Sequence, residues 1–196
     1  MKILFESAFT INQEIKKLIN NEALNSFSNS IYQGDNANYC ISLFHDYLID
    51  PNETNKNFLF YMGENLINWA EKNLNRGYFK MEDVHHGSEL FLGFLPRYID
   101  IFPENLKAKE LIINVSKFIG NWDKETEDWY NYSQKNFNSW YFGSDGISKR
   151  DYYKFNTADH LRFVHIALLA WNITSKQKYL DWSIDYSKQF AERIII

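Results

Sequence analysis

Apolar side chains recur along this chain with the spacing of amphipathic helices, and the helices they predict come in pairs. In each pair, a polar, aromatic-rich stretch leads into an apolar helix. A short turn then connects it to a second amphipathic helix that ends near a tryptophan. This unit occurs three times, over 36–74, 86–122 and 159–193. No useful length of the chain alternates with a period of two, so we predict an all-α fold of stacked helical hairpins.

Two segments depart from this pattern. Pro96 lies inside the leading helix of the second unit, where the lost backbone hydrogen bond costs about 3 kcal/mol unless the helix kinks. A long insertion, 121–158, separates the second unit from the third. We expect a helix over 124–137 and a turn at 143–146. The aromatic density of the insertion favours an ordered segment that carries function.

Composition and charge limit the classes to which this protein can belong and the partners it can bind. With 196 residues and 45% apolar content, the chain forms one α-hairpin domain, 1–196, or part of a larger one. The net charge of −4 is spread without a basic run, which argues against a nucleic-acid partner. No membrane partner is expected, because no segment has a membrane-spanning pattern. Cys40 stands alone and is expected to be buried. If its N-terminus is natural, the chain is cytoplasmic.

The hairpin repeat also predicts where functional side chains gather. If successive hairpins pack side by side, all leading helices point the same way, and the segments that enter them meet on one face. Those segments combine aromatic rings with carboxylates, imidazoles and guanidinium groups, as a polar ligand pocket requires. The candidate catalytic residues are His86, Asp83, Glu89, Tyr141, Asp145 and His160. The candidate substrate-binding residues are Trp140, Arg150, Tyr152, Tyr153, Arg162 and Tyr78.

The segments GSELFLGFLPRYIDIFPENLKAKELIINVSKFIGNW and DHLRFVHIALLAWNITSKQKYLDWSIDYSKQFAERI resemble the hairpins of the six-hairpin (α/α) toroids, a superfamily with many glycoside hydrolases and polysaccharide lyases. The resemblance covers most of 36–196 and concerns the helix pattern. It implies a saccharide ligand and a site where the inner helices begin. Three hairpins make half of such a ring. We therefore expect the chain to belong to a longer protein, or to pair its edges with a second copy as a homodimer.

The candidate residues fit two kinds of saccharide cleavage, and the sequence leaves both open. Hydrolysis needs one protonated and one ionised carboxyl group across the glycosidic bond. The candidates are Asp83, Glu89, Asp145 and Asp159. Elimination from a uronate needs a cation for the sugar carboxylate and a Tyr or His base. Arg150 and Arg162 are candidate cations. Trp129, Trp140 and Tyr141 are candidate stacking platforms for sugar rings.

The densest group of functional side chains is Asp83, His85, His86 and Glu89. Joined by Asp159 or His160, these residues would make a mixed imidazole–carboxylate metal site. A hydrogen-bonded network at a helix start is the preferred interpretation, so we expect no metal and no cofactor. Two other functions remain as alternatives: a non-catalytic α-hairpin binding module or inactive fragment, and a metal-dependent phosphohydrolase.

Overall fold

The structure is a computed structural model that describes residues 10, 13–14, 17–18, 33–154 and 157–194. It is mostly helical with a few short strands, which confirms the all-α class in its main feature. By internal contacts the chain divides into two compact units, 1–66 and 67–196. Among the described residues, no helix combines the length and the apolarity needed to cross a membrane.

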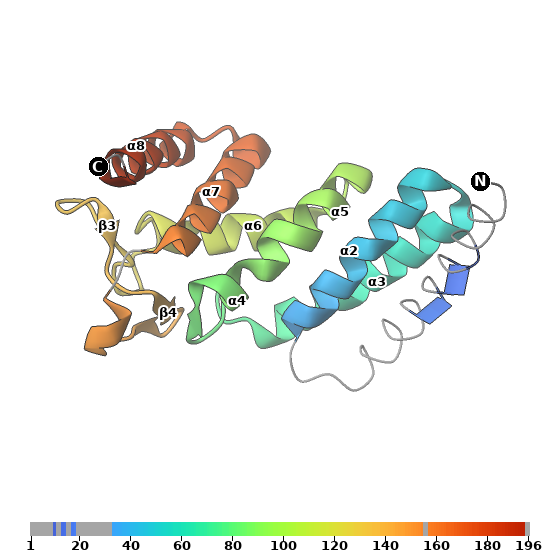
Figure 1. Cartoon of the computed structure of the whole chain (residues 1–196), viewed down its shortest axis with the longest axis horizontal. Coiled ribbons are helices and arrows are strands. Elements are labelled where there is room, and N and C mark those ends of the chain that lie inside the picture. Colours follow the sequence, from blue (N-terminus) through green and yellow to red (C-terminus); the bar gives the residue numbers. More distant parts are fainter. Residues whose placement is uncertain (1–9, 11–12, 15–16, 19–32, 155–156, 195–196) are drawn as a thin grey trace. The chain divides into compact units, whose positions relative to one another are not determined.

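The first unit contains a helix hairpin made of α2 (Gln33–Ile49) and most of α3 (Glu53–Asn73) (Figure 1). The turn between them ends at Asn52, whose side-chain oxygen accepts the amide of Asn55 at 2.8 Å and so caps α3. Cys40 is buried, as the sequence predicts, and burial raises the pKa of its thiol to about 12. Its thiol therefore stays protonated and packs as a small apolar side chain.

The second unit holds the other two hairpins. Its helices are α4 (Val84–Glu89), the π-helical segment η1 (Leu90–Phe94), α5 (Leu95–Ile101), α6 (Leu106–Ile119), α7 (Leu161–Thr174) and α8 (Gln177–Ile194). The segments α4, η1 and α5 follow one another without a break and together form the leading helix of the second hairpin. Helix α6 is its return helix. Helix α7 packs between α6 and α8. The second and third hairpins thus lie next to each other, as the repeat predicts (Figure 1).

The π-helical segment η1 lies directly before Pro96, which is the second residue of α5. The amide of Leu95 donates to the carbonyl of Leu90, which is the wider π-type hydrogen bond. The guanidinium of Arg97 donates to the carbonyl of Gly93 at 2.5 Å. The wider turn and this side-chain donor accommodate a proline that would otherwise disrupt the helix.

The predicted helix over 124–137 is wrong, because this segment contains a β-hairpin. Strands β2 (Tyr130–Asn131) and β3 (Asn136–Phe137) pair antiparallel. The side-chain oxygen of Asn131 accepts the amides of Ser133 and Gln134, both at 3.0 Å, and closes the turn. Lys135 adopts a positive φ of 51° there. A local Asn turn of this kind competes with helix formation.

A second small sheet holds the rest of the insertion. It has the order β1 (Glu82–Asp83), β4 (Tyr141–Gly143) and β5 (Gly146–Ile147), with antiparallel pairing throughout. The predicted turn at 143–146 connects β4 to β5. A Cβ on Gly143 would lie 2.2 Å from the carbonyl oxygen of Lys80, so only glycine fits at this close approach.

Trp129 lies at the centre of the core and is not the stacking platform that the sequence predicted. Its side chain is 1% exposed. The indole stacks on Phe142, with ring centroids 4.2 Å apart, and on Phe118 at 5.0 Å. Its N–H donates to the carbonyl of Gly143 at 3.2 Å. Trp129 therefore anchors the insertion to the helices and has no surface for a sugar ring.

Candidate functional site

The junction of β1 and α4 brings a carboxylate and an imidazole together. Asp83 ends the strand in an extended conformation, and its side chain accepts the amide of His86 at 2.9 Å, which caps α4. The other carboxylate oxygen, Oδ2, lies 2.6 Å from Nδ1 of His86. Asp83 is almost buried, whereas the side chain of His86 is 53% exposed. One local cap therefore presents an oriented imidazole to solvent.

Side chains from the third hairpin meet this junction. Nδ1 of His85 lies 3.5 Å from Oδ1 of Asp159, and its Nε2 lies 3.7 Å from Oε1 of Glu89. Asp159 belongs to the short 3₁₀ helix η3 (Ala158–His160), which leads into α7. Arg162 donates from Nε to the hydroxyl of Ser88 at 2.9 Å. The starts of the two leading helices of the second unit therefore lie side by side, as predicted.

An aromatic surface lies next to the same junction. Tyr141 stands directly opposite Asp83 in the β1–β4 ladder, so both side chains leave the same face of the sheet. The ring of Tyr141 stacks on Tyr153, with centroids 5.0 Å apart and planes 16° apart. Arg150 donates to the hydroxyl of Tyr152 at 2.8 Å. Trp140 is half-buried behind this group, 6.0 Å from Tyr153. Four predicted binding residues thus lie together beside Tyr141, a predicted catalytic residue: Trp140, Arg150, Tyr152 and Tyr153.

The local environment raises the pKa of His86, Glu82 and Tyr141. The hydrogen bond to Asp83 raises the pKa of His86 above its ordinary value of 6.5. Burial raises the pKa of the Glu82 carboxyl, although the amide of Asp83 opposes that shift. Burial also raises the pKa of Tyr141, and the nearby carboxylates of Glu82 and Asp83 add to this effect. The site therefore combines an imidazole and a carboxyl group that both bind a proton more readily than usual.

Three predicted site residues do not join this group. Tyr78 is completely buried, with its hydroxyl pressed against Gly87, so its predicted contact with substrate is wrong. His160 is also fully buried: it accepts the amide of Thr157 at 2.9 Å, contacts the carbonyl of Ser139 at 2.9 Å and stacks on Phe137. Asp145 is exposed in the β4–β5 turn, beyond the end of the pairing with β1.

The structure adds Glu82 to the set, a residue that sequence reasoning passed over. One atom from each of Glu82, Asp83 and His86 lies within 4.8 Å of the other two, a spacing that suits a divalent cation. The available sequence signal was a second carboxylate immediately before Asp83. The metal set considered from the sequence included His160, which is buried elsewhere and cannot contribute.

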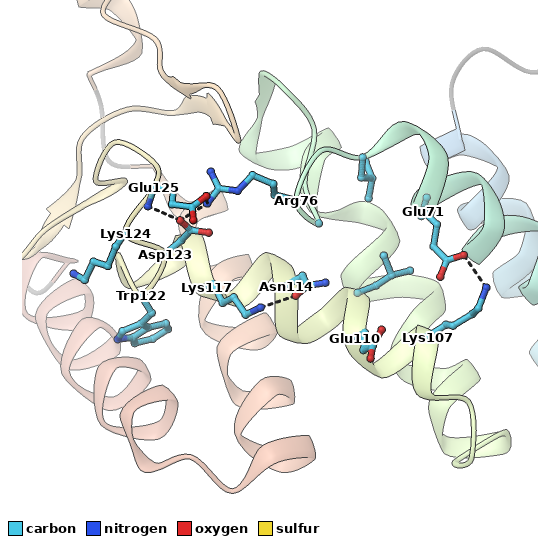
Figure 2. Close-up of a pocket in the computed structure, with 14 residues that line it drawn as sticks. Glu71, Arg76, Lys107, Glu110, Asn114, Lys117, Trp122, Asp123, Lys124 and Glu125 are labelled. Atoms are coloured by element: carbon cyan, nitrogen blue, oxygen red, sulfur yellow. Dashed lines mark hydrogen bonds and ion pairs between the residues drawn. The ribbon is translucent and has the colours of Figure 1, made fainter.

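A groove of about 750 Å³ also lies in the second unit and shares no lining residue with this site. It runs along α6 between the end of α3 and the segment 122–125 (Figure 2). Its polar lining comprises Glu71, Arg76, Lys107, Glu110, Asn114, Lys117, Asp123, Lys124 and Glu125, with Trp122 at one end. Sequence reasoning missed it because its residues belong to the return helices α3 and α6 or to the segments directly after them, and the repeat assigns return helices to packing.

Comparison with known proteins gives no family assignment: no protein-family model, no curated protein and no solved structure matches this chain.

Proposed function

We propose that this protein binds and cleaves a poly- or oligosaccharide at the β1–α4 junction, as a hairpin unit of an (α/α) toroid. The observation that carries the proposal is the position of Tyr141 directly opposite Asp83, which puts an aromatic surface beside an oriented His–Asp pair. Sugar rings pack their C–H faces on such aromatic planes. The proton-transfer groups would then lie at the edge of the bound ring.

The chemistry assigned to this site is general acid–base catalysis. His86 holds its proton through Asp83 and is exposed enough to deliver it to a glycosidic oxygen. Burial raises the pKa of Glu82, which favours this carboxyl as the second proton-transfer group. Arg150, at the rim of the tyrosine surface, provides a positive charge for the carboxylate of a uronate. An acidic saccharide therefore suits the site better than a neutral one.

The test is a cleavage assay with neutral and uronate-containing polysaccharides. Near-UV absorbance of unsaturated products identifies elimination, and reducing ends without that absorbance identify hydrolysis. His86→Gln is expected to lower the rate 10²- to 10⁴-fold, the usual contribution of a general acid or base. His165→Gln, at an exposed histidine of α7 outside the site, serves as the matched control. Equal rates for the two variants would remove His86 from the mechanism. Saccharide binding without turnover would favour a binding module.

The spacing of Glu82, Asp83 and His86 favours one second candidate, a metal-dependent phosphohydrolase. A divalent cation held by two carboxylates and an imidazole would supply an activated water. Equilibrium dialysis against Mn²⁺ tests this function separately. One bound ion that is lost in Asp83→Asn, together with phosphatase activity sensitive to chelation, would support the alternative. Cleavage of saccharide that persists after chelation would support the principal proposal.

A further inference from the structure

The charged side chains that line the groove along α6, Glu110 among the carboxylates, are paired unevenly. Glu71 neutralises Lys107 at 2.8 Å. Asp123 pairs with Arg76, and Glu125 lies 3.5 Å from the same guanidinium. In the part of the chain that the structure describes, no carboxylate lies within ion-pair distance of three lysines around Trp122. These are Lys117, Lys124 and Lys178.

The indole of Trp122 is held firmly at this end of the groove. The amides of Trp122 and Asp123 both donate to the carbonyl of Lys117 at 2.8 Å, which fixes the chain as it leaves α6. The ring lies so close to Gly120 that a Cβ there would be 2.4 Å from it. Tyr179 and the indole pack in a T-shaped arrangement, with centroids 4.7 Å apart. A rigid aromatic ring, half-buried, therefore forms the wall of an open groove (Figure 2).

The three lysines come from different elements, and only the ammonium group of Lys178 is placed over the indole ring. Nζ of Lys178, on α8, lies 5.0 Å from the centroid of Trp122 and 5.0 Å from that of Tyr179. Lys117, on α6, donates to Asn114 at 2.7 Å along the groove. Lys124 follows Trp122 in the chain and lines the groove. Burial and repulsion by Lys176 and Lys117 lower the pKa of Lys178, so an anion here would relieve an existing repulsion.

We propose that this end of the groove binds an oxyanion carried on a sugar-like ring, with the ring packed against Trp122 and the anionic group between the lysine ammonium groups. Either a carboxylate or a phosphate supplies the required negative oxygen atoms. Trp122 supplies a flat apolar surface for the ring. This site shares no residue with the β1–α4 junction, so it stands whether or not saccharide is cleaved there.

The experiment is a titration of the ¹⁵N-labelled full chain with four probes: glucuronate, glucose 6-phosphate, glucose and inorganic phosphate. We expect at least one of the two charged sugars to bind saturably, with chemical-shift changes concentrated in residues 114–125. Glucose is expected to bind more weakly because it lacks the anion. Inorganic phosphate is expected to bind more weakly because it lacks the ring. Comparing glucuronate with glucose 6-phosphate then distinguishes a carboxylate ligand from a phosphate ligand.

Substitutions test whether the lysines carry the binding. Lys117→Met/Lys178→Met is expected to weaken the charged sugar at least about tenfold, because it removes two charged partners. Lys188→Met, on an exposed part of α8, is the matched control, and thermal unfolding checks that all variants fold. The proposal is overturned if neither charged sugar binds saturably. It is equally overturned if the double substitution leaves the affinity unchanged or if the shifts fall outside the groove.

Discussion

Asp83 and Tyr141 are partners in one antiparallel ladder, although Asp83 lies directly before the second hairpin and Tyr141 lies in the insertion that follows it. This pairing connects the cap of α4 to the insertion between the second and third hairpins. It places the side chain of Asp83 and the ring of Tyr141 on the same face of the sheet. The three-stranded sheet is therefore the element on which the geometry of the candidate site depends.

Gly143→Ala is expected to destabilise the protein by roughly 2–3 kcal/mol, because the new methyl group would meet the backbone of Lys80. Backbone atoms cannot rotate away as a side chain can, so β1 and β4 must separate. Chemical denaturation measures the loss. Asp145→Ala, in the same β4–β5 turn but exposed, is expected to stay within about 0.5 kcal/mol of the wild type. Equal effects of the two changes would contradict this account.

Two substitutions at Asp83 separate its role as a helix cap from its charge. Asp83→Ala removes the acceptor for the amide of His86 and is expected to cost about 1 kcal/mol of stability. Asp83→Asn keeps the cap and is expected to cost less. Both changes should lower the pKa of His86 toward its ordinary value, because neither keeps the hydrogen bond to a charged carboxylate that raises it. Urea unfolding and NMR titration of the imidazole measure the two effects. A raised pKa that survives in Asp83→Asn would show that the carboxylate charge is not its cause.

The pair of His86 and Asp83 also predicts a pH dependence of stability. Because folding raises the pKa of His86, its contribution is complete below the ordinary value of 6.5. That contribution is lost as the pH rises through the pKa of the folded state. The difference in stability between the wild type and His86→Gln should therefore shrink on going from acidic to alkaline pH. Denaturation at a series of pH values measures this difference, and one that grew with pH would have the wrong sign.

The buried His160 predicts the opposite dependence. Its Nδ1 accepts the amide of Thr157, so the neutral ring carries its proton on Nε2, facing the carbonyl of Ser139. Burial lowers the pKa of His160 below 6.5. The contribution of neutral His160 to the free energy of unfolding is therefore complete above pH 6.5. It is lost as the pH falls through the pKa of the folded state.

His160→Gln tests this role by comparing two properties in one series of unfolding curves. The variant is expected to be about 1–3 kcal/mol less stable at neutral pH, because its side chain does not reproduce both buried hydrogen bonds. Its stability should also fall less steeply than that of the wild type between pH 6.5 and lower values. A variant with the full acid dependence of the wild type would show that another group titrates.

The sequence predicted the candidate site from residues that are close together in the chain. These predictions held where the interacting side chains belong to one helix start. Asp83 and His86 are three residues apart, so the cap that joins them is already present in the pattern of a helix start. Glu89 follows one turn later on the same helix. The sequence also predicted that η3 and α4 are neighbours, on the condition that successive hairpins pack side by side, and His85 does contact Asp159.

The insertion was harder to predict, because its conformation depends on contacts distant in sequence. Trp129 and Trp140 look equivalent as aromatic residues in a polar segment. Trp129 fills the space between Phe118 and Phe142, whereas Trp140 is half-buried beside Tyr153. Their burial is set by which strand pairs with which. A segment of 124–137 with helical spacing became a β-hairpin for the same reason.

The sequence by itself determined the helical hairpins, the burial of Cys40 and the position of the acidic and imidazole groups at a helix start, because periodicity and capping act within a few residues. The tertiary structure alone decided that Tyr78 and His160 are interior, that Glu82 joins Asp83 and His86, and that Trp122 borders a groove with three lysines. Those outcomes depend on strand register and helix packing. Both are fixed by burying side chains from distant segments against one another, and no local pattern contains that information.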